Sequence, residues 1–127
     1  LLNILLIYVQ RTLSSNTISY TSNALFAKFN DLMLGNNYKI AQPSCYAKKL
    51  KVNVKLLNET VRAITHLSCG EFIRSKTIEE AKRLLKYDPM TCNEIADYLG
   101  FIDPAYFSRF FKREVGISPK NFRDTSS

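Results

Sequence analysis

The sequence predicts an all-α fold, and three features point that way. From residue 24 onward, apolar side chains recur at helical spacing, and no stretch alternates with a period of two for long enough to indicate a strand. Residue pairs that stop or start helices divide the chain, namely Asp88-Pro89, Asp103-Pro104 and Ser118-Pro119. A helical unit also occurs twice, at an offset of about 50 residues. We therefore expect short helices that include one repeated unit.

The first 23 residues differ in character from the rest. LLNILLIYVQRTL, residues 1–13, is strongly apolar but too short to cross a bilayer, and no membrane partner is expected. We expect it to be a docking or dimerisation helix from a missing N-terminal domain, or else a helix that folds back on the local core. Residues 14–23 are rich in Ser, Thr and Asn without a helical period, which predicts a linker.

Residues 24–69 are expected to form the first of two helical subdomains. Its first helix would be capped by Ser22 or Asn23, and further helices are expected over residues 43–50 and 53–64. The inward stripe of the third helix is Leu57, Val61 and Ile64.

A longer helix, residues 70–88, is expected to connect this subdomain to a second one at residues 89–127. Thr91 followed by Glu94 is a capping-box pattern, which predicts a helix over residues 91–100. The last two helices are expected to begin at the two later proline pairs, the final one running through Phe122.

The repeat indicates what the two subdomains are. YAKKLKV at residues 46–52 matches IADYLGF at residues 95–101, and THLSCGEF at residues 65–72 matches VGISPKNF at residues 115–122. Each copy has an alanine that lets two helices cross closely, then a break, then a second amphipathic helix, as a helix-turn-helix requires. The sequence therefore predicts two helix-turn-helix subdomains joined by a long connecting helix.

Charge favours a polyanionic partner. The 127-residue chain has a formal net charge of +7, and most of the basic excess lies in residues 41–87, whereas residues 88–127 carry a slight acidic excess. A basic stretch of this kind favours nucleic acid or an anionic membrane surface, although a solvated basic face has the same composition.

Catalytic and metal-binding patterns are missing from the sequence. Cys45, Cys69 and Cys92 include no C-x-x-C pair and His66 is the single histidine, so a four-ligand zinc site is not available. No phosphate-cradling glycine loop or nucleophile elbow occurs. We expect no enzyme activity, no cofactor and no metal, and we expect reduced cysteines in a cytoplasmic protein.

The helix that begins at Asp103 anchors itself with phenylalanines and presents basic and polar side chains outward. An ordinary amphipathic surface helix explains this pattern equally well, but not a second helix of the same kind about 50 residues upstream. A major groove admits one α-helix, and grooves on one face of DNA lie about 34 Å apart. Two such helices on a rigid connector can therefore read adjacent major grooves.

From about Leu25 to Asp124 the chain resembles the DNA-binding domain of the AraC/XylS family of bacterial transcription activators. The most specific part is IEEAKRLLKYDPMTCNEIADYLGFIDPAYFSRFFKREVGISPKNFR, residues 78–123. The resemblance implies seven helices in two homeodomain-like, three-helix units, with recognition helices at about 54–64 and 104–114. It places base-reading residues at Lys55, Asn58, Glu59, Ala105, Tyr106 and Arg109. It places phosphate contacts at Arg62, Thr91, Lys112 and Ser118, the threonine and serine through helix amide ends.

The sequence departs from the family pattern at a few positions. Lys51 stands where the first turn usually has a small residue, and Pro104 and Ala105 replace frequent polar amides in the second. Glu59 either accepts a hydrogen bond from a cytosine amino group, or repels phosphate and pairs with Lys55 or Arg62. Because Pro104 and Ala105 carry no side-chain hydrogen-bond donor or acceptor, we expect the second recognition helix to form few hydrogen bonds with bases.

The expected function is a sequence-specific double-stranded DNA-binding transcription regulator, an activator, with RNA polymerase and a missing N-terminal effector or dimerisation domain as further partners. The alternative is a protein-interaction module that keeps the helix-turn-helix frame without reading DNA and docks partners through the acidic residues 88–127.

Overall fold

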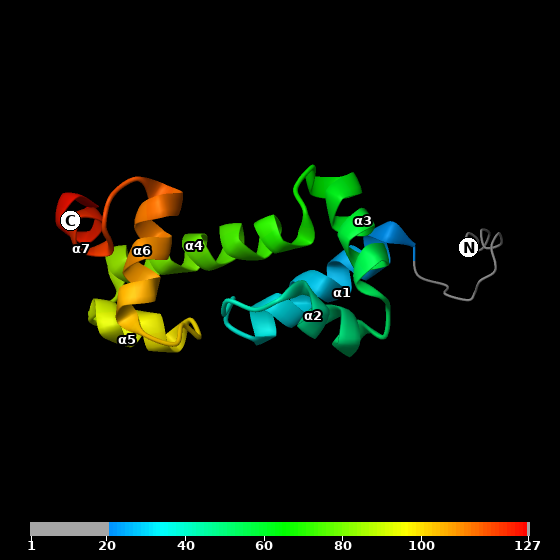
Figure 1. The fold of residues 1–127 in the computed structure, drawn as a ribbon, viewed down its shortest axis with the longest axis horizontal. Helices are drawn as coiled ribbons and strands as arrows, with labels where there is room; N and C mark the ends of the chain where they lie inside the picture. The colour runs from blue at the N-terminus through cyan, green and yellow to red at the C-terminus, as the bar shows by residue number, and fades with distance from the viewer. Residues whose placement is uncertain (1–20, 127) are drawn as a thin grey trace.

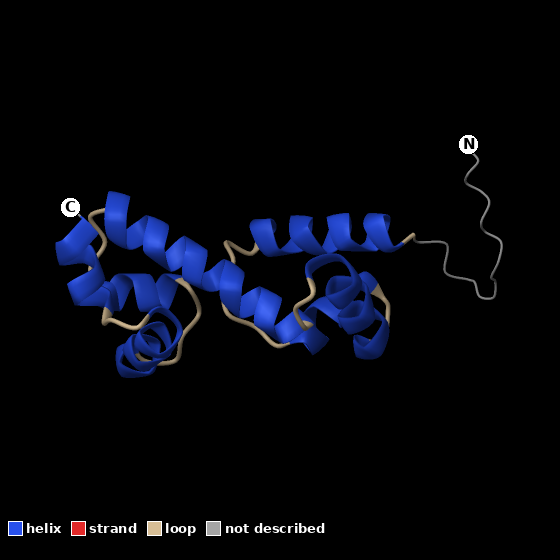
Figure 2. Cartoon of the chain, turned by 90° about the horizontal axis from the view of Figure 1, so that it is seen from above, coloured by secondary structure: helices blue, strands red, loops and turns tan. Residues whose placement is uncertain are grey.

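The computed structural model describes residues 21–126, so the expected helix at residues 1–13 and most of the expected linker lie outside the described residues. Within that range the chain is helical, without a strand (Figure 2). The first helix, α1 (Ser22–Gly35), begins slightly earlier than the sequence suggested. Its cap is Thr21, whose Oγ1 accepts a hydrogen bond from the Ala24 backbone N–H at 3.0 Å, so Ser22 and Asn23 lie in the first turn instead of capping it.

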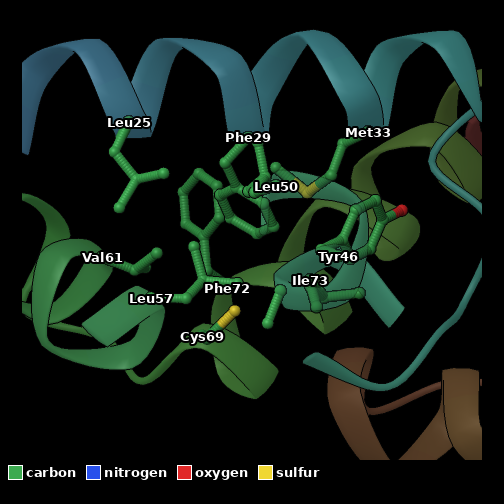
Figure 3. Packing of buried hydrophobic residues seen from close by; sticks show 11 residues of the cluster. Leu25, Phe29, Met33, Tyr46, Leu50, Leu57, Val61, Cys69, Phe72 and Ile73 are labelled. Carbon is green, nitrogen blue, oxygen red and sulfur yellow. The ribbon is translucent and has the colours of Figure 1, made fainter. Parts of the chain in front are cut away.

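The first subdomain consists of α1, α2 (Pro43–Leu50), α3 (Val54–Thr65) and the first half of α4 (Cys69–Tyr87). Figure 3 shows the side chains of these four helices meeting in one core. The Phe29 ring meets the Tyr46 ring edge-on, with centroids 5.3 Å apart, and both side chains are fully buried. The buried members of this core are Leu25, Phe29, Met33, Tyr46, Ala47, Leu50, Leu57, Val61, Cys69, Phe72 and Ile73.

The second subdomain consists of the remaining half of α4, α5 (Cys92–Tyr98), α6 (Pro104–Val115) and α7 (Pro119–Ser126). Phe101 packs against Phe107 and Phe110 with tilted rings, each pair of ring centroids lying 5.1 Å apart. The helix at the C-terminal end extends beyond Phe122, where the sequence analysis ended it. The core is formed by Ile78, Ala81, Leu84, Leu85, Ile95, Ala96, Leu99, Phe101, Phe107, Phe110 and Phe111.

The repeat is reproduced in the backbone. Lys51 and Gly100 occupy equivalent positions in the two turns, and both have a left-handed conformation, with φ of 60° and 84°. The next residue closes each turn in the same way: the N–H of Val52 donates to the Ala47 carbonyl, and the N–H of Phe101 donates to the Ala96 carbonyl, both at 3.0 Å. The unusual Lys51 therefore adopts the glycine conformation at a cost of about 1–2 kcal/mol.

A connecting segment between α1 and α2 ties the two subdomains together. We call residues 36–42 the junction strap. The Ile40 N–H donates to the Leu99 carbonyl of the second subdomain at 2.8 Å, and the Ile40 side chain packs against the second core. The buried Thr77 hydroxyl of α4 donates to the Tyr38 carbonyl at 2.7 Å. Because the strap bonds both to α4 and to the second subdomain, α4 is not the only link between the halves.

One predicted inward position is wrong. Ile64, expected on the inner stripe of α3, is 37% exposed, whereas the polar Thr60 is only 4% exposed and fills the inner position with Leu57 and Val61. The reason is that α3 ends at Thr65, so its last turn extends beyond the core. Among residues 21–126, no helix has both the length and the apolarity of a membrane span.

Candidate nucleic-acid interface

The second helices of the two units, α3 and α6, lie near opposite ends of α4 and run in the same direction (Figure 1). Both start at a side-chain cap. Asn53 Oδ1 accepts from the Leu56 N–H, and Asp103 Oδ1 accepts from the Tyr106 N–H, each at 2.7 Å. Both end at a left-handed residue, His66 and Gly116. The two predicted reading helices therefore begin and end with the same types of cap.

On α3, three of the predicted contact residues share an exposed face. Lys55, Glu59 and Arg62 follow one another at i, i+4 and i+7, and all three are exposed. Within residues 21–126, Glu59 forms no ion pair with Lys55 or Arg62. The Glu59 carboxylate is thus exposed to solvent and available as a hydrogen-bond acceptor.

Asn58 has a contact that the sequence did not predict. Its Oδ1 accepts a hydrogen bond from the Cys69 backbone N–H at 2.8 Å, which joins α3 to the first residue of α4. The side chain is half-buried. Because its oxygen is occupied, Asn58 has its amide nitrogen left for a base edge. Spacing alone could not reveal this, since the partner lies in another helix.

On α6, the predicted base-reading residues Ala105, Tyr106 and Arg109 are all exposed. Tyr106 is 45% exposed, and its ring packs against Phe101 with centroids 5.8 Å apart. The ring is thereby held in place by the second core while part of it faces outward. The arrangement suits apolar contact with a thymine methyl group, with Arg109 beside it as a hydrogen-bond donor.

The residues predicted to contact phosphate differ in how well their surroundings suit an anion. Arg62 and Lys112 are exposed cations on α3 and α6. Ser118 caps α7, its Oγ accepting from the Asn121 N–H at 3.1 Å. Thr91 caps α5 in a capping box, and there the Glu94 carboxylate already accepts the Thr91 N–H at 2.8 Å. A carboxylate at the start of α5 repels phosphate, so the N-terminus of α7 is the better anion site of the two.

The start of α4 has a similar capping box. Glu71 Oε1 accepts the Ser68 N–H at 2.8 Å, and this hydrogen bond lowers the pKa of the Glu71 carboxyl, with smaller contributions from Arg62 and Arg74. Burial raises the pKa of the Cys69 thiol to about 11, so this cysteine is protonated and unreactive at neutral pH. Within the described residues, no three His, Cys, Asp or Glu side chains gather as a metal site would require.

Comparison with known proteins agrees with this geometry. A family profile described as "Helix-turn-helix domain" matches residues 46–125. The HTH-type transcriptional activator RhaR of Salmonella arizonae is 30% identical over 82 residues, which cover 65% of this chain and 29% of RhaR. The chain therefore corresponds to less than a third of the length of that relative.

Solved structures share the fold. The C-terminal domain of AraT, a response regulator from Geobacillus stearothermophilus, superposes with a TM-score of 0.73 at 22% identity, covering 80% of this chain and 84% of that one. The DNA-binding domain of AdpA, solved in complex with a target DNA, superposes with a TM-score of 0.70 at 20% identity, covering 78% and 89%. With the profile match over most of its length, the chain belongs to the AraC-type helix-turn-helix family of transcription regulators and contains the DNA-binding domain of that family.

Proposed function

We propose that this chain is the sequence-specific reading module of a bacterial transcription activator and that α3 and α6 enter adjacent major grooves of double-stranded DNA. The observation that carries the proposal is the presence of two equivalent reading helices, running in the same direction, on one continuous α4. With 19 residues at about 1.5 Å per residue, α4 is about 28 Å long. That length is close to the rise of about 34 Å between grooves on one face of DNA.

The roles divide between bases and phosphates. Lys55, Glu59 and the amide nitrogen of Asn58 would face base edges from α3. Tyr106 and Arg109 would do so from α6, with Ala105 allowing close approach. The phosphate contacts would be Arg62, Lys112, and the helix ends at Ser118 and Thr91.

The name and the length of a relative suggest which partners, besides DNA, the protein has. RhaR is named as a transcriptional activator and is more than three times as long as the matched segment. An N-terminal effector or dimerisation domain and RNA polymerase are therefore the expected further partners, in the cytoplasm. The competing function is a protein-interaction module. Residues 88–127 carry a slight acidic excess, which favours protein contacts by the second subdomain.

Selection of bound duplexes from a random DNA pool at near-physiological salt tests the proposal. Two enriched blocks about 10 base pairs apart are expected, one for each reading helix. On the enriched site, Arg109→Ala should cost about 1–3 kcal/mol and relax the preference within one block. Arg62→Ala should weaken binding to all duplexes and lower the salt slope by about one. Absence of enrichment, with binding that vanishes as salt rises, would favour the protein-interaction module instead.

A further inference from the structure

A hollow of about 450 Å³ lies where the two subdomains meet. Its walls come from the junction strap, the start of α4, the turn before α6, and α6 itself. The charged side chains that line it are Arg74 of α4 and Arg113 of α6, and no carboxylate lines it. Two cations from different subdomains therefore border one space without a neutralising acid on its surface.

Both guanidinium groups keep hydrogen-bond donors available. Arg113 lies over the Phe110 ring at 5.6 Å and pairs through Nε with Glu114 at 3.5 Å, an exposed contact that is weak in water. Arg74 is half-buried, and its terminal nitrogen lies over Gly70, where an added Cβ would be 3.4 Å away. Glycine at position 70 thus leaves room for the Arg74 group at the rim of the hollow.

The hollow opens beside the faces assigned to DNA. On α6, Tyr106, Phe110 and Arg113 all line it, and they follow at i, i+4 and i+7, the stripe that includes a predicted base reader. On the other side, Arg62 and Arg74 both act electrostatically on the Glu71 carboxylate. Arg62 of α3 and Arg74 of α4 therefore lie near the same carboxylate, where these two helices meet.

We infer that Arg74 and Arg113 form a central phosphate seat, which holds the DNA strand that passes between the two major grooves. The inference rests on the proposed DNA-binding function. A phosphodiester is anionic and accepts hydrogen bonds, and guanidinium groups present several N–H donors in a planar fork that fits phosphate oxygens. The strap joins the two subdomains beside this hollow, since Ile40 lines it and donates its N–H to Leu99. The seat adds affinity and register without reading sequence.

The salt dependence of binding to the selected duplex tests the seat. Arg74→Gln and Arg113→Gln should each lower the magnitude of the salt slope by about 0.9, the value for one lost phosphate contact, and leave the enriched sequence unchanged. Arg74→Lys should restore most of the slope. Replacing the central phosphates of the duplex by neutral methylphosphonates should lower the slope of the unmodified protein and remove the difference between it and the two Gln variants.

Lys82→Gln is the matched control, because Lys82 is an exposed cation of α4 that does not line the hollow. If the Arg74 and Arg113 variants behave like Lys82→Gln while Arg62→Gln lowers the slope, the seat is refuted and the DNA-binding function stands. If the variants keep their defect on the methylphosphonate duplex, the arginines act elsewhere and the inference also fails. If the unmodified protein selects no duplex, the inference fails together with the proposed function.

Discussion

At the scale of single residues, the capping box of α4 makes part of the stability depend on pH. The pKa of the folded Glu71 carboxyl lies below its ordinary value of 4.5, because the carboxylate accepts the Ser68 N–H. A lowered folded pKa means that the stabilisation is present above the ordinary value and is lost as the pH falls through the folded pKa.

We expect Glu71→Gln to reduce the acid-induced loss of stability, since glutamine keeps an acceptor oxygen but does not titrate. The check is the free energy of unfolding from urea titrations at a series of pH values on either side of 4.5. Glu79→Gln, an exposed position of the same helix, is the control and should retain the pH dependence of the unmodified protein. Equal curves for both variants would contradict the role given to Glu71.

Gly100 shows how a single backbone conformation is tied to residue type. Its φ of 84° is in the left-handed region, and it lies against Lys39 of the junction strap, with 3.4 Å from an added Cβ to the Lys39 Cβ. We expect Gly100→Ala to destabilise the protein by about 1–2 kcal/mol through backbone strain. Gly35→Ala should cost nothing or stabilise slightly, because Gly35 is helical and nothing lies within 4 Å of an added Cβ. Thermal unfolding of both variants provides the comparison.

At the scale of helices, the half-buried guanidinium of Arg123 joins α7 to the end of α4. Arg123 Nε donates to the Leu85 carbonyl at 2.8 Å, and one of its terminal nitrogens donates to the carbonyls of Leu84 and Asp88, at 3.3 and 2.9 Å. The Leu84 carbonyl also accepts the Asp88 N–H at 3.0 Å, whereas the Leu85 carbonyl has no backbone donor four residues on, because residue 89 is a proline. The side chain therefore caps α4 from another helix.

Arg123→Ala should destabilise the protein by about 1.5–3 kcal/mol, the range for hydrogen bonds to a charged group. Lys120→Ala removes an exposed cation of the same helix, paired with Asp124 at 3.3 Å, and should cost no more than about 1 kcal/mol. Urea denaturation of the two variants measures both values. A loss at Arg123 no larger than that at Lys120 would show that the cap contributes little.

At the scale of the whole molecule, the strap and α4 together determine how the two reading helices are spaced. Ile40 donates its N–H to Leu99 and packs its side chain on the second core. We expect Ile40→Ala to loosen this junction and to broaden the distribution of spacings between the two enriched DNA blocks, with each block still selected. Duplex selection with the variant is the measurement. Ile117→Ala, at an exposed site away from the strap, should keep the original spacing. An unchanged spacing with Ile40→Ala would mean that α4 alone sets the geometry.

The local structure could be predicted from the sequence because its causes are local. Caps at Asn53, Thr91 and Asp103 bond to amides three residues away, and apolar spacing marks the inner face of each helix. The repeat in the sequence indicated two equivalent turns. In the structure Lys51 and Gly100, which occupy the same position in these turns, both have a positive φ. Ile64 was misplaced because periodicity does not tell where the core ends.

The sequence by itself determined the all-α class, the starts of α3, α5 and α6, the duplicated unit and the family, since each depends on residues close together in the chain or on a pattern of residue types. Only the tertiary structure decided which side chains bond to other helices and which stay exposed on the surface. It turned Asn58 toward Cys69, Arg123 toward the end of α4, and Arg74 and Arg113 toward one hollow. Such pairings join residues many positions apart, and their energies depend on distances that arise only when helices pack.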